Sequence, residues 1–231
     1  MKYAIAFAGV AALLVMMSWR IWTSFDTAWG LWFLYPAVAF ALISSAYARN
    51  DPGCFGKRGD GGRSVSRTLL LAPYLLLVAA VWHGLRLMSR EPPYSRLGGG
   101  LILGRRLLST EIPPDAASVV DLTCEFVERP GVRLLGTYRC MPLLDAAAPT
   151  ADALDSIAVE ISQMPGPVLI HCAQGHGRTG MVAAAVLIIA GEAKTAEQAI
   201  SMVRAIRPGV SLNRQQRAAL IGVANRRGIA T

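Results

Sequence analysis

Long uncharged stretches in the first 85 residues limit the fold of this chain more than any other feature. Residues Trp29 to Tyr47 form a run of 19 residues without a charge, and a helix needs roughly 20 apolar residues to cross about 30 Å of hydrocarbon. Further apolar runs cover residues 3–22 and 68–85. We therefore predict about three transmembrane helices, over residues 3–22, 29–47 and 68–85, in a membrane anchor formed by residues 1–93.

The composition of the whole chain also indicates a membrane portion. Hydrophobic residues make up 53% and charged residues 16%, whereas about a quarter of the residues in a soluble domain are charged. A signal peptide would also begin with a basic residue such as Lys2, but no small-x-small cleavage site comes before Trp19, so we expect an uncleaved anchor. The sequence thus predicts an integral membrane protein, in a membrane of the bacterial inner-membrane type.

The loop charges give conflicting indications of membrane sidedness. The segment from Ala48 to Arg67 is basic and rich in glycine, so the positive-inside rule places it in the cytoplasm. Three spans, or a hairpin of the last two alone, would then put the C-terminal part outside. Arginines between Arg86 and Arg106 follow the third run, however, and favour the cytoplasm for that part. The side that the C-terminal part faces stays open.

Net charge and cysteine content narrow the range of partners. The formal net charge of +8 favours anionic partners such as lipid headgroups or phosphorylated substrates, and we expect no nucleic acid. The four cysteines include no Cys-x-x-Cys pair and no zinc-site spacing, so we expect no metal, no cofactor and no disulfide framework.

From about Tyr94 to the end of the chain, short β-rich runs alternate with amphipathic helices. This alternation is typical of an α/β domain with a central, mostly parallel sheet flanked by helices. The expected strands are Leu101–Leu103, Ser118–Leu122, Val132–Tyr138 and Val168–His171, and the expected helices are Thr150–Met164, Thr179–Ala190 and Thr195–Ile206.

The segment Cys172–Arg178 must turn from the end of a buried strand into the start of a buried helix. Amides of such a turn and the helix dipole form a concave site that binds a phosphate group. The same positive field stabilises a thiolate, so we expect Cys172 to be a nucleophile at neutral pH. Arg178 can bind two phosphate oxygens with its planar guanidinium group. The expected phosphate-binding residues are Ala173, Gln174, Gly175, His176, Gly177 and Arg178.

Three other residues have candidate roles near this turn. Thr179 could hydrogen-bond the Cys172 sulfur, or it could cap the helix. His171 could orient the loop, or it could be a buried structural histidine. Asp145, on a loop after the strand Val132–Tyr138, could be the general acid that protonates the leaving oxygen, or it could be an ordinary loop aspartate.

The motif from His171 to Gly180 resembles the Cys-x5-Arg signature of the protein tyrosine and dual-specificity phosphatase superfamily. The likeness extends over about residues 94–228 and includes Gly100–Gly104, Val119–Thr123 and Pro142-x-x-Asp145. It implies a dual-specificity-phosphatase-like fold, hydrolysis of phosphate monoesters through a phosphocysteine intermediate without a metal, and a general acid at Asp145. It also implies that Gln215 orients the hydrolytic water, although Asn213 and Gln216 form a capping-box pair nearby.

The resemblance leaves the substrate open. A membrane anchor suits a lipid phosphate, such as a phosphoinositide or phosphatidylglycerophosphate, and suits equally a phosphotyrosine, phosphoserine or phosphothreonine of a membrane-associated protein. His176 could add charge next to a polyanionic headgroup. A catalytically inactive phosphate-binding module at the membrane is the alternative, but Cys172, Arg178 and Asp145 are all present.

Overall fold

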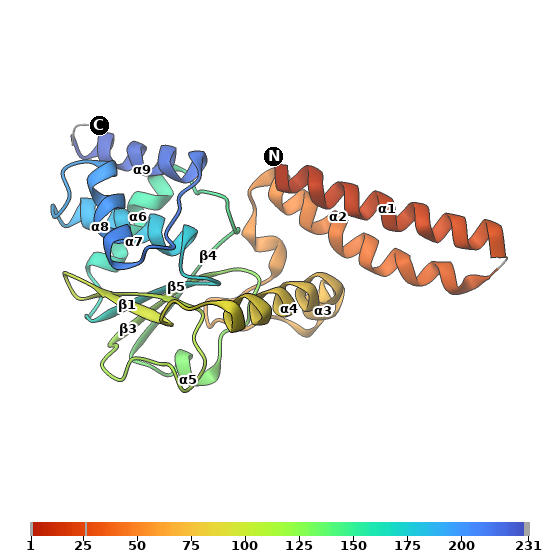
Figure 1. Cartoon of the computed structure of the whole chain (residues 1–231), viewed down its shortest axis with the longest axis horizontal. Coiled ribbons are helices and arrows are strands. Elements are labelled where there is room, and N and C mark those ends of the chain that lie inside the picture. The colour runs from red at the N-terminus through yellow and green to blue at the C-terminus, as the bar shows by residue number, and fades with distance from the viewer. Residues whose placement is uncertain (1, 26, 229–231) are drawn as a thin grey trace.

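The computed structural model describes residues 2–25 and 27–228 and consists of two parts (Figure 1). Residues up to 93 form an N-terminal helical region, and residues 94–228 form an α/β region. The described chain begins near the boundary between the two parts and ends on the α/β region (Figure 1). The long helices of the helical region project from one end of the molecule (Figure 1).

The α/β region is built on a five-stranded sheet with the strand order β1-β2-β5-β3-β4. Only β1 runs antiparallel to its neighbour, and the other pairings are parallel. The mostly parallel α/β fold predicted from the sequence is confirmed. The strands are β1 (Tyr94–Leu97), β2 (Leu101–Arg105), β3 (Ser118–Thr123), β4 (Thr137–Leu143) and β5 (Val168–Cys172).

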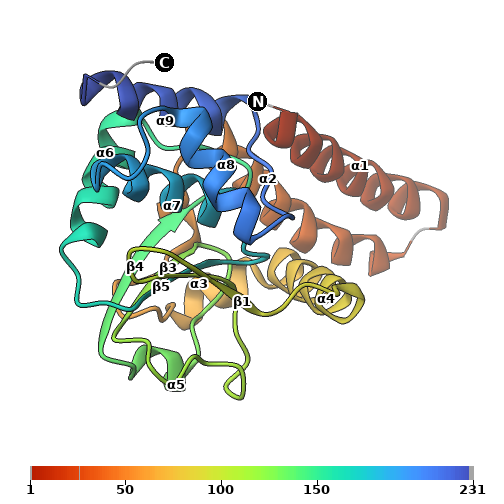
Figure 2. The ribbon, with the colours of Figure 1, turned by 60° about the vertical axis from the view of Figure 1, so that its left-hand side comes forward.

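Helices cover both faces of this sheet, as Figures 1 and 2 show. Helix α7 and the helices packed against it lie on one face, and the short helix α5 lies on the opposite face (Figure 1). Helix α7 packs against the three helices around it, which is why its sequence is apolar on every side. The helices are α5 (Pro130–Arg133), α6 (Ala151–Ser162), α7 (Gly177–Ile189), α8 (Ala196–Ile206) and α9 (Arg214–Arg226).

One predicted strand was wrong. Residues 132–138 were expected to be extended, but the chain forms α5 and then β4, which begins at Thr137. Pro130 starts the short helix, as proline does in a first helical turn, and Gly136 turns the chain with a φ of 38°. Strand β4 lies at the sheet edge and therefore tolerates Pro142, which cannot donate a ladder hydrogen bond.

The N-terminal helical region begins with an antiparallel hairpin of α1 (Lys2–Phe25) and α2 (Leu34–Arg49), joined through the 3-10 helix η1 (Ala28–Phe33). Small residues line the contact between the two helices, which lets their backbones approach closely. They include Ala4, Ala11 and Ser18 on α1 and Ala37, Ala39 and Ala46 on α2. Four tryptophans at the far end of the hairpin are exposed: Trp19, Trp22, Trp29 and Trp32.

Two helical stretches, Lys2–Phe25 and Ala28–Arg49, are long and apolar enough to cross a membrane. They correspond to the first two predicted spans. The third predicted span is divided at Leu71 into α3 (Val65–Leu70) and α4 (Ala72–Met88), of which α4 has only 17 residues. Pro73 lies in the first turn of α4, where its missing N–H is not needed. The structure therefore does not confirm a count of three.

A loop of the helical region fixes it to the sheet. This docking loop, residues 50–64, contains the 3-10 helix η2 (Pro52–Phe55) and follows α2. The Lys57 ammonium contacts the Asp121 carboxylate at 2.5 Å and donates to the carbonyl and hydroxyl oxygens of Thr123, and both charged side chains are fully buried. Arg63 donates to the Cys124 carbonyl at 2.7 Å. The docking loop thus lies at the carboxyl end of β3.

We expect Lys57→Met to lower the free energy of unfolding by about 3 to 5 kcal/mol, because it leaves the buried Asp121 carboxylate without its cation. Arg58→Met is the matched control, since Arg58 pairs with Asp60 at the surface and such pairs contribute little. Thermal unfolding of both variants in the same detergent measures the difference. Equal unfolding temperatures for the two variants would contradict this role of Lys57.

Candidate active site

Cys172 lies at the point where β5 ends and the loop to α7 begins. Its side chain is buried, and the backbone N–H of Gly175 donates to its Sγ at 3.3 Å. The loop of residues 173–176 therefore curls around the sulfur before α7 starts at Gly177. This is the strand–loop–helix turn that the sequence predicts, with the Gly175 amide directed at the sulfur.

The curl of this loop depends on Gly175. Its φ is 75°, in the left-handed region that glycine adopts at little cost. A Cβ atom at this position would also lie 2.6 Å from the backbone of Gly104 on the neighbouring strand β2. Both the conformation and the close approach exclude a larger residue here.

Arg178 lies in the first turn of α7, and its side chain is fully buried. Glu125 accepts two hydrogen bonds from it, at 2.6 Å from Nη2 and 2.9 Å from Nη1, and the Leu143 carbonyl accepts a third from Nη1 at 3.0 Å. The guanidinium group is thus held along one side by Glu125 and Leu143, and on the other side its Nε–H has no partner among the described residues.

Glu125 is a site residue that the sequence analysis missed. It is 6% exposed and follows the carboxyl end of β3, which neighbours β5 in the sheet. Burial raises the pKa of Glu125, but the charge and hydrogen bonds of Arg178 outweigh burial and hold it below its usual value. Carboxyl ends of adjacent parallel strands meet at one edge of a sheet. An acidic residue directly after β3 could therefore have been predicted to lie near Arg178.

Asp145 lies in the turn after β4, next to Arg178. Its Oδ1 is 3.2 Å from Arg178 Nη2, and 68% of its side chain is exposed. The structure therefore brings Asp145, from the turn after β4, to the edge of the sheet where the Cys172–Arg178 segment lies. Asp145 is the exposed member of the group, on a turn that solvent reaches.

The other predicted residues make contacts away from the Cys172 sulfur or line other parts of the fold. The Thr179 hydroxyl donates to the Gly104 carbonyl at 3.4 Å. Gln215 has an exposed side chain and lines a separate cavity beside Ala146, so the structure does not bring it to the loop. Gln216 instead lies against Gly177 and completes the capping box with Asn213 that the sequence indicates.

Two side chains outside the loop hold its backbone. Trp82 of α4 donates its indole N–H to the Ala173 carbonyl at 2.9 Å. Arg207 donates to the Gly175 carbonyl at 2.8 Å and to the Gln174 carbonyl at 3.3 Å. These residues come from the helical region and from the segment after α8, and no motif in the sequence pointed to Trp82.

His176 of the loop is also held from outside. Its Nε2 is 2.6 Å from Glu91, which lies in the segment between α4 and β1. Glu91 accepts a further hydrogen bond from the backbone N–H of Gly209. The imidazole ring is therefore engaged with a protein carboxylate, an arrangement that the sequence analysis did not anticipate.

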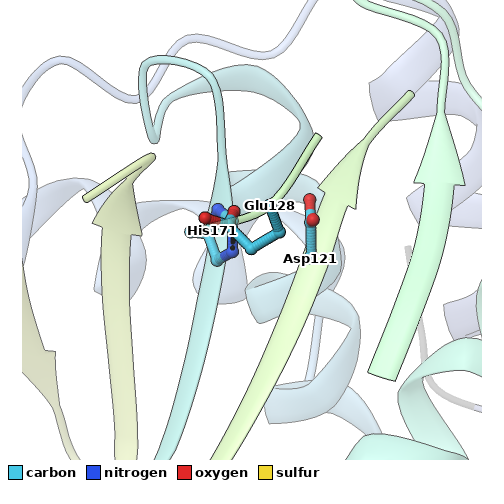
Figure 3. Close-up of side chains that lie close together, drawn as sticks. All are labelled: Asp121, Glu128 and His171. Atoms are coloured by element: carbon cyan, nitrogen blue, oxygen red, sulfur yellow. Dashed lines mark ion pairs between the residues drawn. The ribbon is translucent and has the colours of Figure 1, made fainter. Parts of the chain in front are cut away.

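Behind the loop lies a buried group formed by Asp121, Glu128 and His171 (Figure 3), whose ligand atoms lie within 4.8 Å of one another. His171 Nε2 is 3.5 Å from Glu128. The Asp121 oxygens are already engaged by Lys57 and Thr123, and Tyr138 donates to one of them at 2.8 Å. A protein ammonium group thus supplies positive charge in this cluster, and its contacts do not favour a metal ion.

The Arg178–Glu125 pair gives a prediction for stability against pH. We expect Glu125→Gln to lower the free energy of unfolding by about 3 kcal/mol at pH 7, because buried Arg178 then loses its bidentate carboxylate and keeps only the exposed Asp145 as a counter-charge. A carboxylate with a lowered folded-state pKa stabilises the fold above its unfolded pKa of about 4.3, and this stabilisation is lost as the pH falls through the folded value. The difference in the free energy of unfolding between wild type and Glu125→Gln should therefore shrink below about pH 4.

Denaturant unfolding at neutral and acidic pH in detergent measures this difference. Glu197→Gln serves as the control, because Glu197 forms an exposed pair with Arg217. A difference between wild type and Glu125→Gln that stays constant across the pH range would show that the carboxylate charge of Glu125 does not stabilise the fold.

Comparisons with known proteins agree with this geometry. Residues 122–220 match the PTP-SAK family, described as a Swiss Army Knife protein with a DSP-PTPase phosphatase domain. No curated protein matches the sequence significantly.

Solved structures of phosphatases are similar to the α/β region. The active form of Tk-PTP aligns with 27% identity and a TM-score of 0.52, over 58% of this chain and 98% of its own. A glycine-to-alanine variant of Tk-PTP aligns with 26% identity and a TM-score of 0.54, over 60% and 99% of the two chains. Human DUSP28, at 19% identity and a TM-score of 0.50 over 60% and 97%, shares the fold.

The family match begins at the end of β3, next to Glu125, and includes the Cys172 loop and Arg178. The two Tk-PTP structures are covered almost completely by the alignment, so the likeness extends over the whole of that phosphatase. Residues 122–220 therefore form a phosphatase domain of the cysteine-dependent dual-specificity type, which supports a phosphoric monoester hydrolase of that type.

Proposed function

We propose that the chain hydrolyses phosphate monoesters in two steps, with Cys172 as the nucleophile. In the first step the thiolate sulfur bonds to phosphorus, the bond from phosphorus to the ester oxygen breaks, and Asp145 gives its proton to the leaving oxygen. In the second step water attacks the phosphocysteine, Asp145 takes a proton from that water, and inorganic phosphate and the thiolate are released. Neither step needs a metal ion.

The hydrogen bonds of Arg178 carry this proposal. A guanidinium group has five N–H donors. Glu125 and the Leu143 carbonyl accept three of them. Nε–H has no partner among the described residues, and the remaining Nη2–H lies toward Asp145. These two donors form one edge of the guanidinium fork and match two phosphate oxygens, so charge that develops in the transition state would be stabilised.

The short distance between Asp145 and Arg178 suggests how the acid is placed. Asp145 Oδ1 lies 3.2 Å from the same Nη2 that would bind phosphate. A bound phosphate would replace this contact and leave the Asp145 carboxyl next to the leaving oxygen. The exposure of Asp145 on a turn allows this small displacement.

Two variants and two substrates test the chemical roles. Cys172→Ser should abolish phosphate release and the phosphoenzyme that rapid quenching traps in the wild type. Asp145→Ala should lower kcat for an alkyl phosphate by about 10²- to 10⁴-fold and lower it less for p-nitrophenyl phosphate, whose leaving group needs no proton. Asp152→Ala, an exposed aspartate on α6 that pairs with Arg226, is the control and should change neither rate.

Equal losses on both substrates for Asp145→Ala would remove it as the general acid. Phosphate release by Cys172→Ser at the wild-type rate would overturn the whole mechanism.

We further propose that α1 and α2 cross the membrane as a hairpin and that the α/β region lies on its cytoplasmic side. The docking loop contacts the carboxyl end of β3 through Lys57 and Arg63, so this loop and the α/β region belong on the same side. The positive-inside rule favours the cytoplasm for the basic docking loop and for the arginines after α4 alike. The conflict between the two sets of charges disappears when α4 does not cross.

Cysteine substitution tests this orientation in intact cells with a membrane-impermeant maleimide. Arg58→Cys in the docking loop and Asn225→Cys on α9 should be protected until the membrane is permeabilised, whereas Ser24→Cys at the hairpin tip should react from outside. All three positions are exposed in the structure. Labelling of Arg58→Cys and Asn225→Cys from opposite sides would contradict the proposal.

A further inference from the structure

A cavity of about 250 Å³ lies between the helical region and the loop of residues 173–176, here called the catalytic loop. Tyr3 and Phe7 of α1 and Tyr47 of α2 form one wall of this front cavity. Helix α4, which packs against α2 (Figure 1), forms the other wall. Asp145 and the loop residues Ala173 and Gln174 also line it, so the front cavity adjoins the proposed phosphate site.

The two ends of the front cavity differ in chemistry. At the catalytic end it reaches Asp145, Glu125 and the backbone of the loop. Along α4 its lining is mostly apolar: beside the buried rings of Tyr74 and Trp82 it consists of Leu77, Val78, Val81 and Leu85. A ligand that fits this cavity therefore carries a phosphate at one end and a hydrocarbon portion at the other.

The front cavity has an exposed edge on α4, here called its lip. Leu77, Val81 and Leu85 recur every four residues on α4, and each is about half exposed although each also lines the cavity. A helical stripe with this spacing forms one continuous apolar face. In the proposed membrane arrangement this stripe meets the acyl chains beside α2, so the front cavity opens sideways into the bilayer.

We propose that the natural substrate is a membrane lipid that carries a phosphate monoester, and that it enters from the side along α4. Its phosphate would bind at the Cys172 loop, and the part next to the headgroup would lie against α4. This inference rests on the proposed function and names its substrate class. A volume of about 250 Å³ is smaller than pockets that enclose whole ligands, which measure about 300 to 1,000 Å³. Most of the lipid therefore stays in the bilayer.

A phosphopeptide suits the front cavity less well. A bound peptide has backbone N–H and C=O groups that need hydrogen-bond partners once they leave water. The α4 wall offers only apolar side chains along its exposed stripe. Burial of hydrocarbon against the same wall is favourable and needs no partner. The chemistry of the wall thus favours a lipid over a peptide.

The test uses the full-length protein in phosphatidylcholine vesicles that contain dioleoyl phosphatidic acid. Val81→Trp fills the lip of the front cavity, and the matched control Leu76→Trp adds the same side chain to an exposed α4 position that does not line it. We expect Val81→Trp to lower kcat/KM for the lipid at least about tenfold more than for p-nitrophenyl phosphate. A tenfold difference in kcat/KM corresponds to the loss of contact between the wall and roughly two methylene groups of the lipid. Leu76→Trp should leave the ratio unchanged.

A second measurement needs no variant. For the wild type, kcat/KM should rise from glycerol 3-phosphate through phosphatidic acids of increasing chain length, and should exceed kcat/KM for a phosphotyrosyl peptide. Faster turnover of the peptide, or no dependence on chain length, overturns the lipid assignment while hydrolysis of p-nitrophenyl phosphate still supports the phosphatase mechanism. Loss of the mechanism itself is recognised separately, by undiminished hydrolysis in Cys172→Ser.

Discussion

The buried contact between Lys57 and Asp121 connects the helical region to the sheet, and the position of the catalytic loop depends on it. Removing two charges from water costs several kcal/mol per ion unless their remaining hydrogen-bonding groups are satisfied. Here Thr123 and Tyr138 complete the network. The docking loop that carries Lys57 leads directly into α3 and α4, so this contact also fixes where α4 passes the loop around Cys172.

The loop around Cys172 is held by residues that are distant in the sequence. Trp82 and Glu91 come from the end of the helical region, and Arg207 comes from the segment after α8. Arg178 is held in turn by Glu125 at the end of β3. The amides of the loop can therefore point at one place before any phosphate arrives, which is the preorganisation that lowers a transition-state barrier without reorganisation at the moment of reaction.

The sequence predicted the strand, loop and helix around Cys172 because all three are local. A buried apolar run, a glycine-containing turn and a second apolar run leave one arrangement for the residues between them. The partner of Arg178 was not predicted, because Glu125 lies 53 residues away and only the strand order brings it close. The contact of Trp82 with the loop was not predicted for the same reason, because Trp82 lies 91 residues away from Ala173 in the sequence. The misplaced strand before Asp145 has another cause: Pro130 and Gly136 override the β-propensity of the residues between them.

The tryptophans at the far end of the hairpin have a consequence for how substrate is found. Indole rings favour the level of the lipid headgroups, and α1, with 24 residues, measures about 36 Å. In the proposed arrangement the rings at one surface and the docking loop at the other hold the catalytic loop at a constant height above the hydrocarbon. A lipid substrate would then reach Cys172 by lateral diffusion within one leaflet, and the reaction rate would follow its mole fraction in that surface instead of its concentration in solution.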